Sequence, residues 1–386
     1  MLTNMEDKTS SFFAAKLPAQ AQMLSNRLQK RFRHLKKWAH RTGVGIFRLY
    51  DKDIPEIPLV LDFYGDCTQP QECAISGALY KRPYEKDADD EEKWLNAMKD
   101  SIAASLGVPL NNIFLKQRQR QKGISQYEKI NEARFEKIVS EGGLLANKLC
   151  FKVNLSDYLD TGLFVDRRLL RNLIRAESSG KKVLNLFSYT GSFSVYAAAG
   201  GAVSTDSVDL SNTYLNWARE NFSLNGFSAV MSRDSRGDAE DVERRREEEK
   251  KVSKHKLIRA DVLEFLERAV LEKRRWDIII LDPPAFSNSK KMIGNFDLNR
   301  DLTGLLCRCL ELLAPDGKIF LSVNLRRAAP DAAELEAELQ AQCLTAAKVN
   351  EKLCCKMRVT DLGNSIVDED FRGKKVPKAF EIRFDT

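Results

Sequence analysis

The sequence predicts a doubly wound α/β domain preceded by a smaller α+β domain, and three observations carry this prediction. The chain has 386 residues, which is enough for two or three domains. Hydrophobic residues make up 43% and charged residues 30%, the balance of a globular protein with a sizeable core. From residue 182 onward, short apolar segments alternate with amphipathic ones, which is typical of a parallel sheet with helical crossovers.

The N-terminal region is predicted to be a leader followed by an α+β domain over 24–155. Residues 1–23 are rich in alanine, serine and glutamine with weak periodicity, so we expect a flexible leader. Apolar residues recur at helical spacing from Leu24 to Trp38, and Gly43 is a natural stop, which predicts a helix over 24–41. The other expected elements are strands at 45–50, 59–64, 72–75 and 113–118, a helix at 91–106, and a hairpin of 135–139 with 144–153.

The second domain is expected to span 156–386. Its predicted strands are 182–187, 203–208, 256–259, 276–281 and 318–323, and its helices are 192–199, 212–224, 262–273 and 298–313. Two closing strands are expected at 354–359 and 379–384. Between residues 233 and 256, 17 of 24 residues are charged, so we expect a mobile surface insertion or an exposed charged helix there.

Positive charge is concentrated in the first domain. The net charge is +7, and the segment from Arg27 to Lys52 holds nine Lys or Arg residues against one acid, Asp51. This concentration predicts a local surface that binds a polyanion. The residues expected to bind RNA are Arg27 and Arg31 on the first helix, with Lys116, Arg118, Arg120 and Lys122, which would share one face of an extended strand. The alternative is an edge strand that charge protects from pairing.

Several classes of protein are excluded by composition. No run approaches the ~18 apolar residues of a membrane span, and the N-terminus lacks the basic and apolar regions of a signal peptide. The eight cysteines have neither zinc nor redox spacing, so we expect reduced thiols, no metal site and a cytoplasmic protein.

Polar residues follow the first three strands of the second domain. The turn after strand 182–187 contains Gly191, and a strand, a tight turn and a helix start form the ligand crevice of open α/β sheets. The missing G-x-G-x-x-G argues against a dinucleotide. Asp209, which Leu210 and Ser211 follow, can accept hydrogen bonds from both hydroxyls of a ribose. Asp261, which precedes Val262, can accept a hydrogen bond from an adenine amino group. The alternative is that Asp209, Ser211 and Asp261 are helix N-caps.

The most specific signal follows the fourth strand, where the chain reads Asp282-Pro283-Pro284-Ala285-Phe286. Two prolines hold the chain extended and leave carbonyl groups unpaired. Asp282 and these carbonyls can dock a planar base, and Phe286 is available for stacking. The alternative is a simple strand terminator. Together the four strand ends predict methyl transfer from an adenosyl cofactor.

Seven segments carry a resemblance to a known family. In the second domain they are LNLFSYTGSFSVYAAAGGA, STDSVDLSNTYLNWARENFSLNG and DIIILDPPAFSNSKKM. Upstream they are NRLQKRFRHLKKWA, FRLYDKDIPE, LKQRQRQKGISQYEK and VNLSDYLDTGLFVDRRLLR. The chain resembles the RNA methyltransferases that use S-adenosylmethionine. It is most similar to the guanine-N7 methyltransferase half of the bifunctional 23S ribosomal RNA methyltransferase of many bacteria, over roughly residues 24–386.

The resemblance implies a Rossmann-like class I methyltransferase fold, S-adenosylmethionine as cofactor, and 23S ribosomal RNA or an assembling large-subunit particle as partner. It implies that the cofactor and base pockets are lined by Phe164, Asp166, Arg168, Asn185, Phe187, Ser188, Tyr189, Thr190, Gly191, Asp209, Leu210, Ser211, Asp261, Val262 and Asp282, with Asp166 and Arg168 at the entrance. The fused guanine-N2 half is missing, so the chain would be a stand-alone version. The charged insertion at 233–256 is not part of the family pattern.

Three other reactions or roles stay open at this point. Cytosine-C5 methylation needs a thiolate after the fifth strand, where this chain has Asn324. Cys307 and Cys309 have apolar neighbours on a predicted helix and are expected to be core. Methylation of another nitrogen, or of a protein, is the second possibility, and a non-catalytic RNA-binding role is the third. Guanine N7 is favoured because it has a lone pair and no proton to remove, so the enzyme need only orient it.

Overall fold

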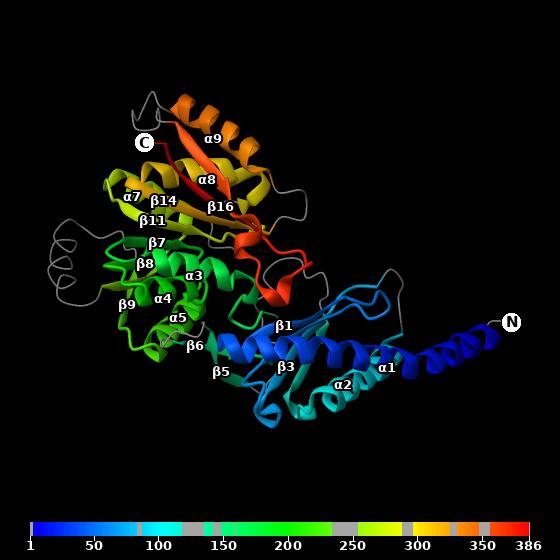
Figure 1. Cartoon of the computed structure of the whole chain (residues 1–386). Coiled ribbons are helices and arrows are strands. Elements are labelled where there is room, and N and C mark those ends of the chain that lie inside the picture. The colour runs from blue at the N-terminus through cyan, green and yellow to red at the C-terminus, as the bar shows by residue number, and fades with distance from the viewer. Residues whose placement is uncertain are drawn as a thin grey trace. The chain divides into compact units, whose positions relative to one another are not determined.

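Figure 1 shows the computed structural model, in which the chain divides into two compact units. Unit 1 is Met1–Thr161 with Glu369–Lys374, and unit 2 is Gly162–Asp368 with Lys375–Thr386. The structure describes residues 3–82, 87–117, 135–141, 148–158, 160–233, 254–287, 296–324, 330–346 and 356–385, with the backbone alone for 3–15, 233, 287 and 344–346. The charged insertion therefore lies almost wholly outside the described residues.

Unit 1 begins with one long helix, α1 (Thr3–Thr42), which starts well before the helix predicted over 24–41. The structure differs from the predicted leader for a physical reason. Leu17 and Ala21 pack against the core of this unit, and the Trp94 indole of α2 (Ala88–Leu106) donates to Gln20 at 2.7 Å. Residues 17–23 are therefore part of the packed unit.

A four-stranded sheet lies beside these helices. Its strands pair in the order β1-β2-β3-β4, and the bounds are Ile46–Asp51, Leu59–Tyr64, Ala74–Leu79 and Ile113–Gln117. The rings of Phe47 and Phe63 stack at 5.0 Å, and Leu24, Leu28 and Leu35 of α1 are fully buried in the same core, as their spacing predicts. The predicted hairpin is present as β5 (Glu136–Glu141) and β6 (Leu149–Asn154).

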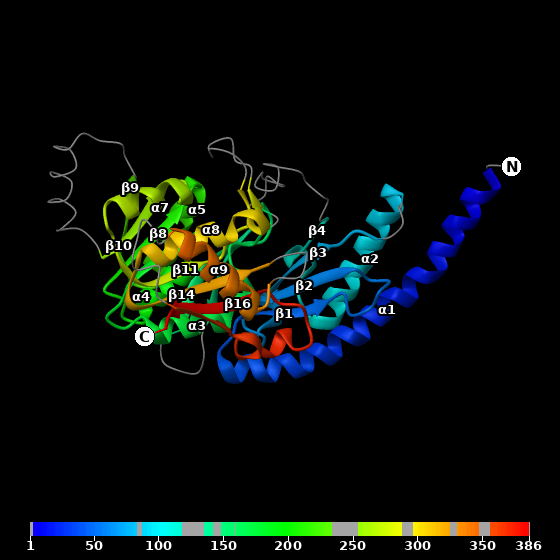
Figure 2. The same cartoon turned by 90° about the horizontal axis from the view of Figure 1, so that it is seen from above.

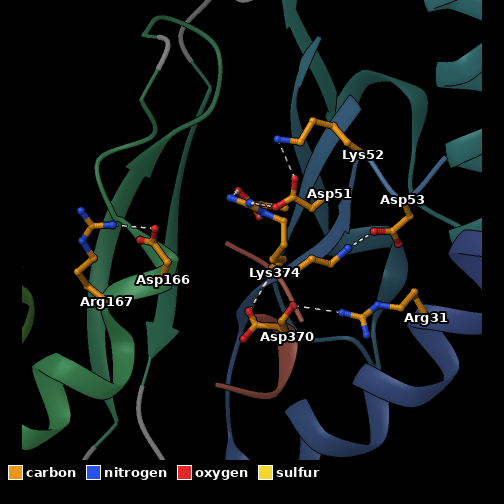
Figure 3. Close-up of polar contacts among 10 residues, drawn as sticks. Arg31, Asp51, Lys52, Asp53, Asp166, Arg167, Asp370 and Lys374 are labelled. Atoms are coloured by element: carbon orange, nitrogen blue, oxygen red, sulfur yellow. Dashed lines mark hydrogen bonds and ion pairs between the residues drawn. The ribbon is translucent and has the colours of Figure 1, made fainter. Parts of the chain in front are cut away.

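A segment from near the C-terminus completes unit 1. In Glu369–Lys374, the fully buried Asp370 accepts a hydrogen bond from the Arg48 amide at 2.9 Å, and its carbonyl accepts one from Arg31 at 3.1 Å. Lys374 pairs with Asp53 (Figure 3). Asp53 also pairs with Arg27 at 2.7 Å. We call this segment the C-terminal strap.

Unit 2 is built on an eight-stranded sheet of order β15-β16-β14-β11-β7-β8-β10-β9, in which only β16 runs antiparallel to its neighbours. The doubly wound parallel sheet predicted from the sequence is confirmed. Its strands are β7 (Lys182–Leu186), β8 (Ser204–Asp209), β9 (Ala229–Arg233), β10 (His255–Arg259), β11 (Trp276–Leu281), β14 (Leu313–Val323), β15 (Met357–Asp361) and β16 (Lys378–Phe384).

Helices cover both faces of this sheet because successive strand residues point to opposite sides. Leu184 and Ile279 face α7 (Val262–Leu271), α8 (Leu298–Glu311) and α9 (Ala332–Ala346), while Val183 and Ile280 face α3 (Arg168–Glu177) and α4 (Ser192–Ala199). Figure 2 shows this unit from a second direction. Another crossover helix, α5 (Asn212–Leu224), has the bounds predicted from the sequence. The strand order reverses between β7 and β11, so the expected crevice lies at their carboxyl ends.

Candidate active site

The turn after β7 is tight and conformationally unusual. Phe187 and Tyr189 have positive φ angles of 55° and 49°, and Gly191 has φ 73°. Positive φ is strained for non-glycine residues and clusters at functional sites. A Cβ atom on Gly191 would lie 2.8 Å from that of Ala218, so only glycine fits. Thr190 fixes the turn by donating to the Gly162 carbonyl at 2.6 Å.

Asn185 lies below this turn, at the end of β7. Its side chain is 1% exposed and donates to the Ser194 hydroxyl at 2.9 Å, which also accepts from Ser207 at 2.7 Å. The polar network therefore ties β7 to α4 and β8. Ser194 and Ser207 are residues that the sequence reasoning did not single out, because a serine within a buried helix or strand has no distinctive sequence pattern.

Asp209, at the end of β8, is held from two sides. Its carboxylate accepts backbone hydrogen bonds from Tyr189 at 2.9 Å and from Ser211 at 2.8 Å. Burial raises the pKa of Asp209 to about 6, against the opposing effect of these backbone donors. Ser211 is the N-cap of α5, with its hydroxyl accepting from Tyr214, as the capping alternative predicts. Asp209 is thus a positioned carboxylate beside the turn, and Leu210 follows it half-exposed.

Asp261, at the end of β10, caps α7. One carboxylate oxygen accepts from the amides of Leu263 at 2.9 Å and Glu264 at 3.3 Å. The N-cap alternative is therefore the role that the structure assigns to that oxygen. Val262, which was expected to line the cofactor pocket, is 5% exposed and belongs to the core between α7 and the sheet.

Asp282, at the end of β11, forms a bidentate ion pair with Arg167. Nη2 of Arg167 lies 3.0 Å from one carboxylate oxygen, and Nε lies 3.3 Å from the other. The remaining Nη1 donates to Asp166 at 2.7 Å, a contact drawn in Figure 3. Burial by itself lowers the pKa of Arg167, but the two carboxylates together raise it above its ordinary value, so the guanidinium stays charged.

The structure corrects the prediction for Arg168. Arg168 is 2% exposed and pairs with Asp368 at 2.7 Å, so it is buried within unit 2. Its neighbour Arg167 is the one that reaches Asp282. Arg167 ends a 3-10 turn (Val165–Arg167) and Arg168 begins α3, so the two adjacent side chains point in different directions.

Several aromatic residues belong to this edge of the sheet, and some of their rings contact one another. Phe164 is 39% exposed and lies 5.4 Å from the ring of Tyr189, which makes an edge contact with Tyr214 at 4.5 Å. Phe187 packs against Phe296 at 5.6 Å. After Asp282, Pro283 is buried, Pro284 is half-buried and Phe286 is 53% exposed, the exposure that a stacking surface requires.

Of the six cationic residues predicted to bind RNA, the three that the structure describes are engaged within unit 1. Lys116 is 8% exposed, its ammonium donates to the Tyr158 carbonyl, and burial lowers its pKa to about 8. Lys116 is therefore not a surface cation, which corrects the prediction. Arg27 pairs with Asp53 and Arg31 with the C-terminal strap. Arg118, Arg120 and Lys122 lie outside the described residues.

Comparison with known proteins identifies the family. Residues 78–240 match the model of S-adenosylmethionine-dependent methyltransferases. The chain is 41% identical to "Ribosomal RNA large subunit methyltransferase K" of Neisseria meningitidis over 374 residues, 97% of this chain and 90% of that protein. The chain belongs to the ribosomal RNA large subunit methyltransferase K/L family. It is also 43% identical to the K/L protein of Methylococcus capsulatus, covering 81% of this chain but 38% of that protein.

Solved structures agree with the fold of a K/L-family enzyme. SMU.776, described as a methyltransferase and complexed with SAH, aligns with a TM-score of 0.64 and 23% identity over 94% of this chain and 81% of that one. A SAM-dependent methyltransferase from Agrobacterium tumefaciens aligns at 0.51 and 18% identity over 89% and 91%. The protein is an S-adenosylmethionine-dependent methyltransferase of class I fold. No helix in the described part of the chain is long and apolar enough to cross a membrane.

The residues at this strand edge fit an adenosyl cofactor. The Ser188 hydroxyl is buried and has no hydrogen-bond partner among the described residues, which marks a polar group that a ligand can satisfy. Gly191 lets the backbone turn sharply at the start of α4. Asp209 adds a carboxylate, fixed by the Tyr189 amide, that can accept hydrogen bonds from hydroxyl groups. A polar cradle of this kind suits a ribose better than a pyrophosphate.

Proposed function

We propose that this protein transfers the methyl group of S-adenosylmethionine to N7 of a guanine in large-subunit ribosomal RNA. The supporting observation is the carboxylate of Asp282, held by Arg167 at the end of β11 in a family whose members carry ribosomal RNA methyltransferase names. When bound, the cofactor supplies an electrophilic methyl group. Asp209, the Ser188 hydroxyl and the 187–191 turn would hold it, while Asp282, the following prolines and Phe286 would position the base.

The remaining side chains suit a nitrogen that needs no deprotonation. The sequence has three histidines, and the one in unit 2, His255, is the first residue of β10, at the amino end of the strand and far along it from Asp261. Asn324 follows β14, where C5 methylation would require a thiol. Burial raises the pKa of the Cys309 thiol on α8, so that cysteine is an inert core residue. Orientation of a lone pair is the chemistry that these residues support.

Contact with RNA is proposed for the outward face of α1. Lys30, Arg33, Lys37 and Arg41 recur every three or four residues, are exposed, and form no ion pair with another described residue. Arg27 and Arg31 are instead paired within unit 1, with Asp53 and the Asp370 carbonyl. The outward cations would bind phosphates without reading sequence.

The function is tested by nucleoside mass spectrometry of unmodified large-subunit ribosomal RNA treated with the protein and methyl-labelled S-adenosylmethionine. We expect label in 7-methylguanosine. Asp282→Ala should remove it while cofactor affinity stays within about tenfold, since the carboxylate positions the base. Asp277→Ala, at the opposite end of the same strand, is the matched control. Label in N2-methylguanosine or 5-methylcytidine would contradict the proposal.

A further inference from the structure

The ion pair between Arg167 and Asp282 has an informative geometry. Two parallel N–H groups of the guanidinium, Nε and Nη2, donate to the two oxygens of one carboxylate at 3.3 and 3.0 Å. Arg167 is 7% exposed, and the Asp282 side chain is 14% exposed. The carboxylate is therefore placed to accept two parallel N–H donors in a largely desolvated position, where such bidentate contacts are strong and geometrically specific.

Among the four RNA bases, only guanine offers the same pattern. Its Watson–Crick edge presents N1–H and an N2 amino hydrogen side by side. Adenine and cytosine each present one donor beside an acceptor, and uracil presents one donor between two acceptors. A base taken into an enzyme pocket is commonly read at this edge. A carboxylate that accepts a guanidinium fork is thus complementary to guanine and repels the acceptor atoms of the other bases.

We propose that Arg167 occupies the place of the guanine edge in the free enzyme, and that N1–H and N2–H of the target guanine replace it on Asp282. This inference rests on the proposed function and gives it a base-reading residue. It also explains the choice of atom, because N1 and N2 are engaged by the carboxylate while N7, on the opposite edge of the base, is left free to accept a methyl group.

Arg167 can leave Asp282 and still keep other contacts that stabilise its positive charge. Its third donor, Nη1, contacts Asp166 at 2.7 Å, and its guanidinium carbon lies 5.5 Å from the centre of the Phe164 ring. Both contacts involve atoms other than those facing Asp282. The Arg167 cation therefore stays paired with a second carboxylate, that of Asp166. When guanine replaces Arg167 on Asp282, no buried charge is left without a partner.

The first test uses a short RNA that the protein methylates, with the acceptor guanosine replaced by inosine, which lacks the N2 amine. We expect kcat/KM for inosine to fall about 10- to 100-fold, because one carboxylate oxygen loses its donor. In Asp282→Asn the guanosine-to-inosine ratio should collapse toward one. RNA with 7-deazaguanosine should not be methylated but should bind with parent affinity, which reports docking without transfer.

The outcomes separate the two proposals. Formation of 7-methylguanosine from guanosine, with 7-methylinosine formed at an equal rate from inosine, would overturn the base-reading role of Asp282 and leave the proposed function intact. Absence of 7-methylguanosine from every RNA would overturn the function, and the base-reading role would fall with it.

A second test addresses Arg167 itself. In Arg167→Ala, added methylguanidinium should refill the vacated place and inhibit in competition with RNA. If Arg167 were instead required for transfer, methylguanidinium would restore lost activity, and that result would overturn the exchange. Arg167→Lys keeps the charge for folding but cannot present two parallel N–H groups. We expect its KM for RNA to be no higher than that of the parent, and a tenfold rise would contradict the proposal.

Discussion

At the scale of single residues, the carboxylate of Asp209 combines a defined position with a raised pKa. We expect Asp209→Ala to weaken S-adenosylmethionine binding by about 1–3 kcal/mol, because ligand hydroxyls would lose their acceptor. Calorimetry measures this directly. Unchanged affinity would remove Asp209 from the proposed cofactor site.

The protonation of Asp209 gives this prediction a pH dependence. Its pKa is raised from an ordinary value of 3.8 to about 6, so the carboxylate takes up a proton as the pH falls through 6. Cofactor affinity should decrease below that pH in the parent protein and stay flat in Asp209→Asn. The free energy of unfolding changes with pH in the opposite direction to cofactor affinity. Burial favours the neutral acid, so the native state loses stability as the pH rises from about 4 to 6.

Gly191 provides a second prediction at this scale, with a matched control in the same unit. Gly191 and Gly180 share φ 73°, but a Cβ atom on Gly191 would lie 2.8 Å from Ala218 whereas one on Gly180 would meet nothing within 4 Å. Both alanine variants carry the strain of positive φ, about 1–3 kcal/mol. Thermal unfolding should show a larger loss for Gly191→Ala, and equal losses would mean that α5 moves aside.

The site residues show how far sequence reasoning reaches. Strand-end position is readable from alternation, so Asp209, Asp261 and Asp282 could be placed at one sheet edge. Which of two adjacent arginines turns toward Asp282 depends on where a 3-10 turn gives way to α3, and that is not readable from residue types. Capping by Asp261 and pairing of Lys116 likewise depend on tertiary contacts.

At the scale of elements, α1 separates its cations by face. Changing Lys30, Arg33, Lys37 and Arg41 to Gln should weaken RNA binding and flatten its salt dependence, by about 0.7 in log–log slope for each phosphate of a single strand that the variant no longer binds. Cofactor affinity should not change. Filter binding across a salt series measures both the affinity and the slope.

The matched control is Lys181, Lys182, Lys273 and Arg275 changed to Gln. These cations are exposed near the amino ends of β7 and β11, away from the carboxyl edge. Both quadruple variants lower the formal net charge from +7 to +3. Equal effects of the two would indicate that only net charge matters, and the outward face of α1 would lose its proposed role.

Elements with a strong local pattern were predictable, and α4, α5 and β11 have the predicted bounds. The elements β9, α3 and α9 are among those that the sequence did not predict. Strand β9 is short and borders the charged insertion, and α3 lies within a segment noted only for its family resemblance. The start of α9 carries a readable signal, since Asp331 and Glu334 cap one another at 2.8 and 3.2 Å.

At the scale of the whole molecule, the C-terminal strap supports unit 1 through Asp370. Asp370→Ala would leave the Arg48 amide without its acceptor, and we expect a loss of about 1–3 kcal/mol in the free energy of unfolding. Asp100→Ala, at an exposed position on α2 in the same unit, should change stability by less than about 0.5 kcal/mol. Denaturant titration compares them, and equal stability would show that water replaces the Asp370 carboxylate.

The strap also bears on the order in which the protein is made. Translation releases Met1–Thr161 first, yet Asp53, Arg31 and Arg48 meet their strap partners only when Glu369–Lys374 is synthesised, 208 residues after Thr161. At about 5–20 residues per second, the nascent first unit waits roughly 10–40 s with these polar groups unmatched. Unit 1 is first in the chain and among the last parts to be finished, so ribosome stalling anywhere in between leaves it incomplete and open to proteolysis.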